Sequence, residues 1–174
     1  AGEICSKLCE LAELHDADLM LVASHRKGFL KRALMGSTTF ELARATTLPL
    51  LINKDEEDET TENLLETVLI PTDFSRKSLE ALNIVRSLRE YVGRVLFVHV
   101  IEHSRNKHDY KEKFASARLF LQELVDEMKI FGIEADYRIA HGVASKKIGA
   151  ICERDGVSLI MMAKTGADMT NGDE

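Results

Sequence analysis

Short apolar runs alternate with longer amphipathic segments along this chain. Each run is continuously apolar or alternating, and polar or turn-forming residues bound it, which predicts buried β-strands. These strands are expected at Leu19–Val22, Leu48–Ile52, Val68–Ile70, Val95–Ile101, Ile133–Ala140 and Leu159–Met162. Strands that are apolar on both sides and alternate with helices form a parallel sheet covered on both faces. The pattern therefore predicts a doubly wound α/β fold, in which ligands bind at the carboxyl ends of the strands.

The segments between the strands carry apolar residues three or four positions apart, as on one face of a helix. One helix is expected over 3–15, another over 79–92, and a long one over 114–131. Thr38 and Glu41 have the spacing of a capping box, so a further helix should begin there.

Residues 2–23 recur without a gap at 142–163. Identical residues pair at Gly2 and Gly142, Lys7 and Lys147, Glu13 and Glu153, Leu19 and Leu159, and Ala23 and Ala163. Each copy reads as an amphipathic helix followed by a short strand. The copies are separated by a domain length and not by the shorter period of a solenoid. The chain is therefore expected to be a window cut from a tandem of two related domains.

This repeat gives a domain organisation. Residues 1–53 are expected to form the C-terminal part of a first domain, and 66–174 the N-terminal part of a second. The segment 54–65 between them begins with KDEEDETTEN, a charged run with almost no apolar residue. Such a run is typical of a solvated acidic linker and is favoured here over an acidic binding tail.

Composition narrows the classes of function. A hydrophobic content of 45% supports a buried core, and a net charge of −6 argues against a nucleic-acid-binding surface. No apolar run approaches the ~20 residues that a membrane span needs. The three cysteines, Cys5, Cys9 and Cys152, form no disulfide framework, which indicates a reducing cytoplasm.

Three segments together resemble the universal stress protein family. They are VLIPTDFSRKSLEAL at 68–82, LFVHVIE at 96–102 and DLMLVASHRKGFLKRALMGSTTFELARATTLPLLINK at 18–54. The resemblance covers most of the chain and is more specific for fold than for function, because the family contains adenine-nucleotide binders and members that bind none. It implies an open parallel five-stranded sheet of order 3-2-1-4-5, often with strand 5 at a dimer contact.

The resemblance also implies site residues. In nucleotide-binding members a carboxylate ends strand 1 and the main chain after strand 2 reads the adenine edge; the matching residues are Asp73 and Val100. A glycine loop after strand 4 supplies N–H groups for the phosphates. The positions that match this loop are Gly36, Ser37 and Thr38 in the first copy and Ala163 and Gly166 in the second. The implied cofactor is ATP with magnesium.

The glycine signature is incomplete in both copies. The family pattern is Gly, two residues, Gly, nine residues, Gly, then Ser or Thr. Ala23 and Arg26 stand at the first two glycines of the first copy, and Ala163 stands at the first glycine of the second. Alanine disfavours a positive φ, by about 1 kcal/mol or more. Arg26 either fills the phosphate space or contacts a phosphate directly.

The candidate residues also have structural explanations. Asp73 precedes a predicted helix and is equally well explained as a helix cap. Ser37 and Thr38 are favoured as caps over phosphate ligands, although a cap can serve both purposes.

No metal site and no catalytic centre are expected. Cys5 and Cys9 lie one helical turn apart, but no His or Cys pair completes a zinc set. His103, His108 and Asp109 fit a solvated polar loop better than a metal site. No Ser–His–Asp, paired-carboxylate or Cys–His arrangement has motif support.

Two hypotheses follow. The first is a cytoplasmic, non-catalytic regulatory protein of the universal stress class whose degenerate site binds ATP. The second is a nucleotide-free dimerising interaction module, such as the soluble regulatory domain of a transporter. Under both, the two halves should complement each other, either within one chain as a permuted domain or between chains as a swapped dimer, because an isolated pair of strands leaves open edges. A homodimer or a swapped oligomer is the expected assembly.

Overall fold

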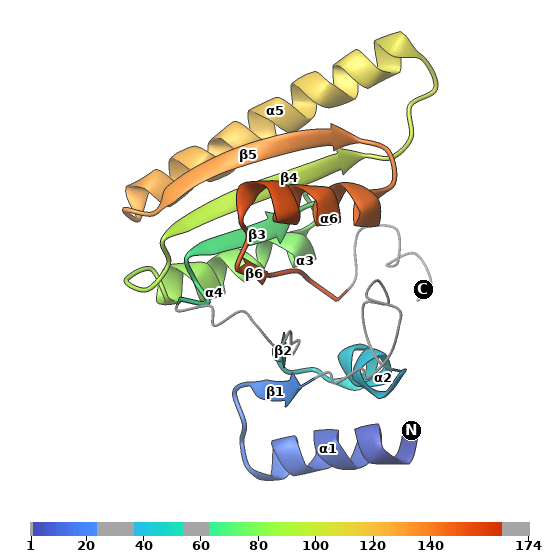
Figure 1. The fold of residues 1–174 in the computed structure, drawn as a ribbon, viewed down its shortest axis with the longest axis vertical. Helices are drawn as coiled ribbons and strands as arrows, with labels where there is room; N and C mark the ends of the chain where they lie inside the picture. Colours follow the sequence, from blue (N-terminus) through green and yellow to red (C-terminus); the bar gives the residue numbers. More distant parts are fainter. Residues whose placement is uncertain (1, 24–36, 54–62, 165–174) are drawn as a thin grey trace. The chain divides into compact units, whose positions relative to one another are not determined.

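The computed structural model describes residues 2–23, 37–53 and 63–164. The chain divides into two compact units, Ala1–Thr60 and Thr61–Glu174. Both units combine helices with parallel strands (Figure 1), so the predicted α/β class is confirmed. No helix among the described residues is long and apolar enough to cross a membrane.

The first unit contains two helices and a two-stranded sheet. Its elements are α1 (Gly2–Leu14), β1 (Met20–Ala23), α2 (Ser37–Ala45) and β2 (Leu50–Asn53). The strands are parallel, with Met20 opposite Leu50, and the N–H of Met20 donates to the carbonyl of Pro49. Cys5 of α1 and Leu42 of α2 are buried. The predicted helix and strands of this segment are therefore found, each within two residues of its expected bounds.

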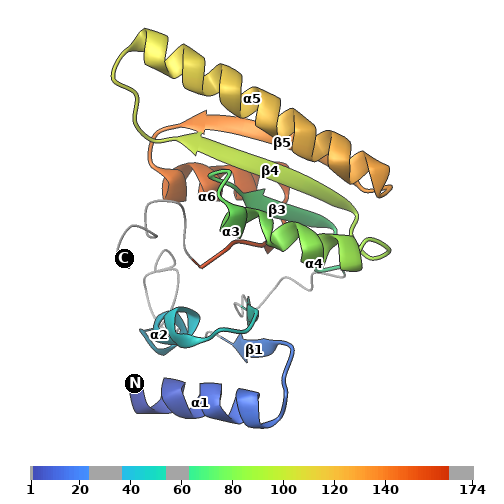
Figure 2. The same ribbon diagram turned by 180° about the vertical axis from the view of Figure 1, so that it is seen from behind.

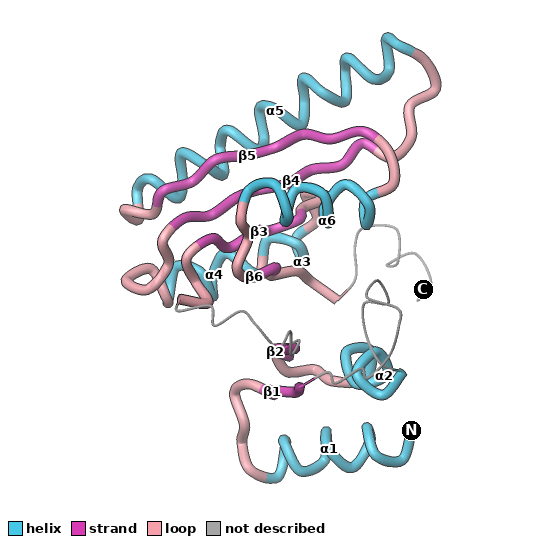
Figure 3. The backbone as a smooth tube through the Cα atoms, in the orientation of Figure 1, coloured by secondary structure: helices cyan, strands magenta, loops and turns pink. Residues whose placement is uncertain are grey.

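The second unit carries most of the fold. Its elements are β3 (Thr67–Pro71), α3 (Arg76–Leu79), α4 (Ala81–Ser87), β4 (Arg94–Ile101), α5 (Lys107–Ile130), β5 (Glu134–His141), α6 (Ala144–Asp155) and β6 (Leu159–Ile160). All pairings are parallel and the strand order is β5-β4-β3-β6 (Figure 3). The chain runs outward from β3 to β5 and returns to the other side of β3 at β6. The order therefore reverses between β3 and β6.

Helices cover both faces of this sheet. Figure 2 shows α4 and α5 on one face, and Figure 1 shows α6 on the other. The larger core lies under α4 and α5 and includes Val85, Phe97 and Leu121, all fully buried. Ile151 of α6 packs against Leu69 on the opposite face. Full burial of each such side chain contributes about 1.5–3 kcal/mol, so both faces stabilise the sheet.

The described strands do not confirm the single five-stranded sheet that the resemblance implied. The described strands form a four-stranded sheet in one unit and a two-stranded sheet in the other. Strand β6 is also shorter than the expected Leu159–Met162, although the N–H of Met161 still donates to the carbonyl of Leu69 (2.9 Å).

The helix expected over 79–92 is interrupted and ends early. It is divided at Glu80 into α3 and α4, and α4 stops at Ser87. Val92 is nevertheless buried, because the turn after α4 carries it back to the core. The apolar stripe correctly identified the buried face but not the end of the helix.

The amino edge of the sheet is held by several cross-connections. The carbonyl of Thr67 accepts from both the N–H and the hydroxyl of Ser158, and Ser158 Oγ accepts from the N–H of Thr67 (2.9 Å). Arg94 donates to Thr67 Oγ1 and to the carbonyl of Asp155. A Cβ on Gly93 would lie 2.5 Å from the carbonyl oxygen of Glu66, so only glycine fits there.

Candidate functional site

Three of the sequence-predicted site residues lie at one edge of the four-stranded sheet. Asp73 follows the end of β3, Val100 is next to last in β4, and Ala163 follows β6. Because the strands are parallel, these positions share the carboxyl edge, and β3 and β6 flank the point where strand order reverses. Doubly wound sheets bind ligands at such a point.

The remaining candidates are placed differently. Ser37 and Thr38 are exposed in the first turn of α2, in the first unit, so Thr38 lies inside the helix and not at its cap. Gly36, Gly166 and Arg26 lie outside the described residues. The structure thus assembles Asp73, Val100 and Ala163 at one edge of a single sheet, and it describes no common site for them with Ser37 and Thr38.

A network of hydroxyl groups shapes the turn after β3. Thr72 Oγ1 accepts from the N–H of Phe74 (2.9 Å) and shares a buried hydrogen bond with Ser78 Oγ (3.0 Å). Ser75 is the N-cap of α3, and its hydroxyl accepts from the N–H of Ser78. Asp73 is therefore not the cap. Its Oδ1 instead accepts from the N–H of Ser75 (3.0 Å), which forms an Asx turn on an exposed side chain.

Phe74 adopts a strained backbone within this turn. Its φ is +65°, a conformation that costs a non-glycine residue about 1–2 kcal/mol. Its ring stacks on His99 of β4, with centroids 4.5 Å apart, and packs against Phe120 of α5 at 5.2 Å. The side chain of His99 also reaches the carbonyl of Thr72 through Nδ1 (2.8 Å). Strained residues held by their surroundings cluster at functional sites.

The main chain of Val100 faces the space beyond the end of β3. The carbonyl of Val98 accepts from the N–H of Thr72 (2.9 Å), so Val98 faces β3. Alternate residues of a strand direct their backbone groups to the same side. Val100 therefore also faces that side, but β3 ends at Pro71, which pairs with Val98. An N–H donor and a C=O acceptor are thus presented together at this edge.

Glu102 links β4 to α6 at the same edge. Its Oε1 accepts from the N–H of Ala144, the first residue of α6, at 2.7 Å. The N-cap residue of α6, Val143, makes no side-chain capping bond, so the carboxylate of Glu102 takes over this function.

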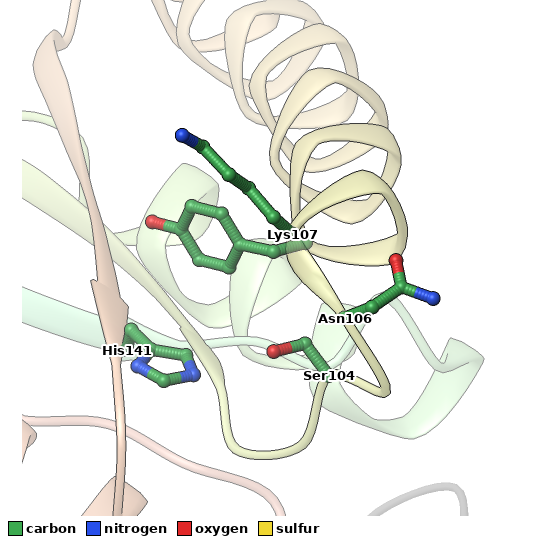
Figure 4. Close-up of a pocket in the computed structure, with 5 residues that line it drawn as sticks. Ser104, Asn106, Lys107 and His141 are labelled. Atoms are coloured by element: carbon green, nitrogen blue, oxygen red, sulfur yellow. The ribbon is translucent and has the colours of Figure 1, made fainter.

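A shallow hollow of about 290 Å³ lies where the β4–α5 loop approaches the end of β5 (Figure 4). It is lined by Ser104, Asn106, Lys107, Tyr110 and His141. Asn106 is the N-cap of α5, and its Oδ1 accepts from the N–H groups of His108 and Asp109.

Asp109 organises the loop beside this hollow. Its carboxylate accepts from the N–H of Arg105 (2.7 Å) and pairs with Lys113 (3.3 Å). The backbone hydrogen bond from Arg105, aided by Lys113, holds the pKa of Asp109 below 3.8. His108 pairs with Glu112. Asp109 thus serves the loop itself, and the described residues contain no cluster of three or more His, Cys, Asp or Glu side chains placed to hold a metal.

The family model of the universal stress proteins matches residues 1–54. That segment is similar to the universal stress proteins. The resemblance inferred from the sequence motifs is thereby confirmed. No curated protein matches the chain.

Solved structures extend the likeness to the rest of the fold. A universal stress protein from Archaeoglobus fulgidus DSM 4304 aligns with a TM-score of 0.70 at 23% identity, over 97% of this chain and 60% of that one. The hypothetical protein MJ0577 aligns with a TM-score of 0.55 at 24% identity, over 63% of this chain and 82% of that one. A protein of the universal stress protein family from Burkholderia pseudomallei aligns with a TM-score of 0.50 at 18% identity, over 57% of this chain and 82% of that one. At these identities the likeness establishes the fold, and the chain spans 60% of the length of the Archaeoglobus protein.

Several residues at this edge were not identified from the sequence. Phe74 and His99 gave no signal, because aromatic residues near strand ends are usually core residues. Glu102 also gave none, since its partner is distant in sequence. Asn106 could have been found, because Asn before a helix is a preferred cap.

Proposed function

We propose that this protein is a non-catalytic regulatory protein of the universal stress class that binds an adenine nucleotide at the carboxyl edge of the four-stranded sheet. One observation carries the proposal: Asp73 and the main chain of Val100 stand at the ends of adjacent strands, beside the reversal of strand order. The three cysteines are free, which fits a reducing cytoplasm.

The chemistry of these two residues matches adenosine. An adenine edge presents an acceptor next to an amino donor, and the N–H and C=O of Val100 complement that pair. A carboxylate near a sheet reversal typically accepts hydrogen bonds from ribose hydroxyls, which is the role we give Asp73. The resemblance implies magnesium with the triphosphate. Ala163, at the position of the first loop glycine, weakens the phosphate end of the site, so we expect modest affinity.

Calorimetric titration of the full chain with ATP and magnesium tests the proposal. We expect a measurable binding heat, a raised unfolding temperature, and weaker binding of GTP, whose base presents a different edge. The variant Asp73→Asn keeps an acceptor for the N–H of Ser75 but removes the charge, so affinity should fall about tenfold. Asp126→Asn, an exposed aspartate of α5, should leave affinity unchanged. Absence of both heat and thermal shift in the unsubstituted protein would end the nucleotide hypothesis.

The second candidate function is a nucleotide-free dimerising module, such as the regulatory domain of a transporter. Two observations favour it: an alanine at position 163 in place of the loop glycine, and exposed apolar residues in the first unit, with Leu14 75% and Leu21 68% exposed. A dimer whose stability does not respond to ATP would select this function. A transporter gene would encode several apolar spans of about 20 residues beside this segment.

A further inference from the structure

The hollow beside β5 is distinct from the proposed nucleotide site. None of its lining residues is Asp73, Val100 or Ala163. Its volume of about 290 Å³ is at the lower end for small-molecule sites, which begin near 300 Å³. Figure 4 shows Ser104 and His141 pointing toward each other across it, while Asn106 turns away. Any ligand must therefore be small.

Apart from the amide of Asn106, which caps α5, the polar side chains that line the hollow are not used by the protein. Within the described parts of the chain, the hydroxyls of Ser104 and Tyr110, the ammonium of Lys107 and the ring nitrogens of His141 form no hydrogen bond or ion pair. The ring of Tyr110 meets that of His141 edge to face, at 5.3 Å, and so fixes the orientation of the imidazole.

Two neighbouring basic groups, those of Arg105 and Lys113, are in contrast already paired. Lys113 binds the carboxylate of Asp109 and the carbonyl of His103, and Arg105 also contacts Asp109. The charge of Lys107 is thus left uncompensated at the hollow. The segment 103–113 carries more Lys and Arg than Asp and Glu, although the chain as a whole has a net charge of −6.

We propose that this hollow binds a small phosphate-bearing anion, either free phosphate or a phosphate monoester. A lysine ammonium offers only donors, and hydroxyl and imidazole N–H groups can add more. A phosphate supplies negative charge and several acceptor oxygens, and charge-assisted hydrogen bonds to such oxygens are strong. Lys107 provides the charge, Ser104, Tyr110 and His141 provide donors, and the Tyr110 ring forms the wall. The open shape of the hollow predicts a dissociation constant of about 1 mM.

Nuclear magnetic resonance of the full chain tests this inference, at constant ionic strength, with inorganic phosphate and separately with glycerol phosphate. We expect saturable shifts of the amide signals of Ser104, Lys107, Tyr110 and His141. A stronger response to glycerol phosphate would identify a monoester as the ligand, and a response of equal strength would identify the phosphate group alone.

Three variants make the test specific. Lys107→Ala should weaken phosphate binding about tenfold, whereas Lys111→Ala, an exposed lysine one turn further along α5, should change it less than twofold. Tyr110→Phe keeps the ring and removes only the hydroxyl, so it should weaken binding without altering the fold. Shifts that do not saturate, or equal losses in Lys107→Ala and Lys111→Ala, would overturn the proposal.

The nucleotide site is tested in the same experiment. Asp73→Asn should leave the phosphate response unchanged, because Asp73 does not line the hollow. If that variant abolishes the response, the phosphate binds at the proposed nucleotide site and this inference is wrong. If the phosphate response survives in a protein that does not bind ATP, this inference stands and the nucleotide proposal fails.

Discussion

The ring of Phe74 stacks on the imidazole of His99 with centroids 4.5 Å apart, while the backbone of Phe74 is held at a φ of +65°. Two opposing contributions therefore meet at one residue. Aromatic packing stabilises the turn after β3, and the left-handed backbone destabilises it. Thr72, which accepts from the N–H of Phe74 and whose carbonyl contacts His99, holds the two together.

Substitutions at Phe74 should separate these contributions. Phe74→Ala loses the ring contacts and keeps the backbone strain, so it should lower the free energy of unfolding by about 1–3 kcal/mol. Phe74→Gly loses the same contacts but relieves the strain, and it should be about 1 kcal/mol more stable than Phe74→Ala. Urea denaturation measures both. A glycine variant less stable than the alanine variant would show that the left-handed backbone is not a source of strain.

A pair of glycine substitutions tests the close approach at the amino edge. A Cβ at position 93 would overlap the carbonyl of Glu66, so Gly93→Ala should destabilise the protein by about 2 kcal/mol or more. Gly149 is exposed in α6, and a methyl group on its Cα would meet no heavy atom within 4 Å. Gly149→Ala should therefore stabilise the protein by about 0.5–1 kcal/mol. Thermal unfolding of both variants measures the contrast, and similar effects at the two positions would contradict it.

The hydrophobic pattern predicted the strands well because burial determines it. The runs at 68–70 and 95–101 fall within strands whose residues are mostly buried, with His99 and Val100 half-buried. Boundaries were less accurate where the deciding contact is distant in sequence. Helix α4 ends at Ser87 because the turn that follows is held by Gly93 against residues 65 and 66, and the apolar stripe carries no sign of that contact.

The candidate site could be predicted only in part. Asp73 and Val100 were identified from motif positions, and the strand order brings them to one edge. The left-handed conformation of Phe74 was not predictable, because sequence rules reserve that conformation for Gly and Asn. The hollow was also missed: Lys107 and His141 are distant in sequence, and only the pairing of β4 with β5 brings them together.

Acidic pH should weaken the contacts around Asp155. The hydrogen bond from Arg154, aided by the charge of Arg138, outweighs burial and holds the pKa of Asp155 below 3.8. Because the pKa of Asp155 is lower in the folded state than in the unfolded state, the ionised carboxylate stabilises the fold above pH 3.8. This contribution is lost as the pH falls through the lowered pKa of the folded state. Asp155→Asn should thus be less stable than the unsubstituted protein near neutral pH, and the difference should shrink as the pH falls below 3.8 and through the lowered pKa of the folded state.

Denaturant titrations across the acidic range measure this difference. Glu153→Gln serves as the control. It removes one negative charge from the same helix, and Glu153 forms no ion pair with Arg138. A deficit of Asp155→Asn that stays constant down to the most acidic conditions would contradict the assignment of the stabilising contacts to the ionised carboxylate.

The capping role of Glu102 can be tested by two substitutions. Glu102→Ala leaves the N–H of Ala144 without its acceptor and should cost about 1 kcal/mol. Glu102→Gln keeps an oxygen acceptor and should recover most of that loss. Guanidinium unfolding at neutral pH compares them, and equal losses in the two variants would exclude a capping hydrogen bond.

The state of assembly is a further prediction. A two-stranded sheet is only marginally stable by itself, and β6 is an edge strand among the described residues. We therefore expect the full chain to form a dimer or a larger oligomer, whose mass light scattering measures. Under the second functional hypothesis, this mass should not depend on ATP. A monomer whose residues 1–53 are separately mobile would contradict the expected exchange or pairing of strands.

The bonds between Thr67, Ser158 and Arg94 make the rigidity of the four-stranded sheet asymmetric. At the amino edge, side-chain hydrogen bonds connect β3 and β4 with Ser158, directly before β6. The carboxyl edge combines the hydrogen bonds of Thr72 and Glu102 with ring contacts and one strained turn. Local opening should therefore begin at the carboxyl edge of the sheet, with amide hydrogen exchange fastest near Phe74 and slowest near Thr67. Small molecules can then enter and leave by transient local opening of the carboxyl edge, while the amino edge keeps the strands in register.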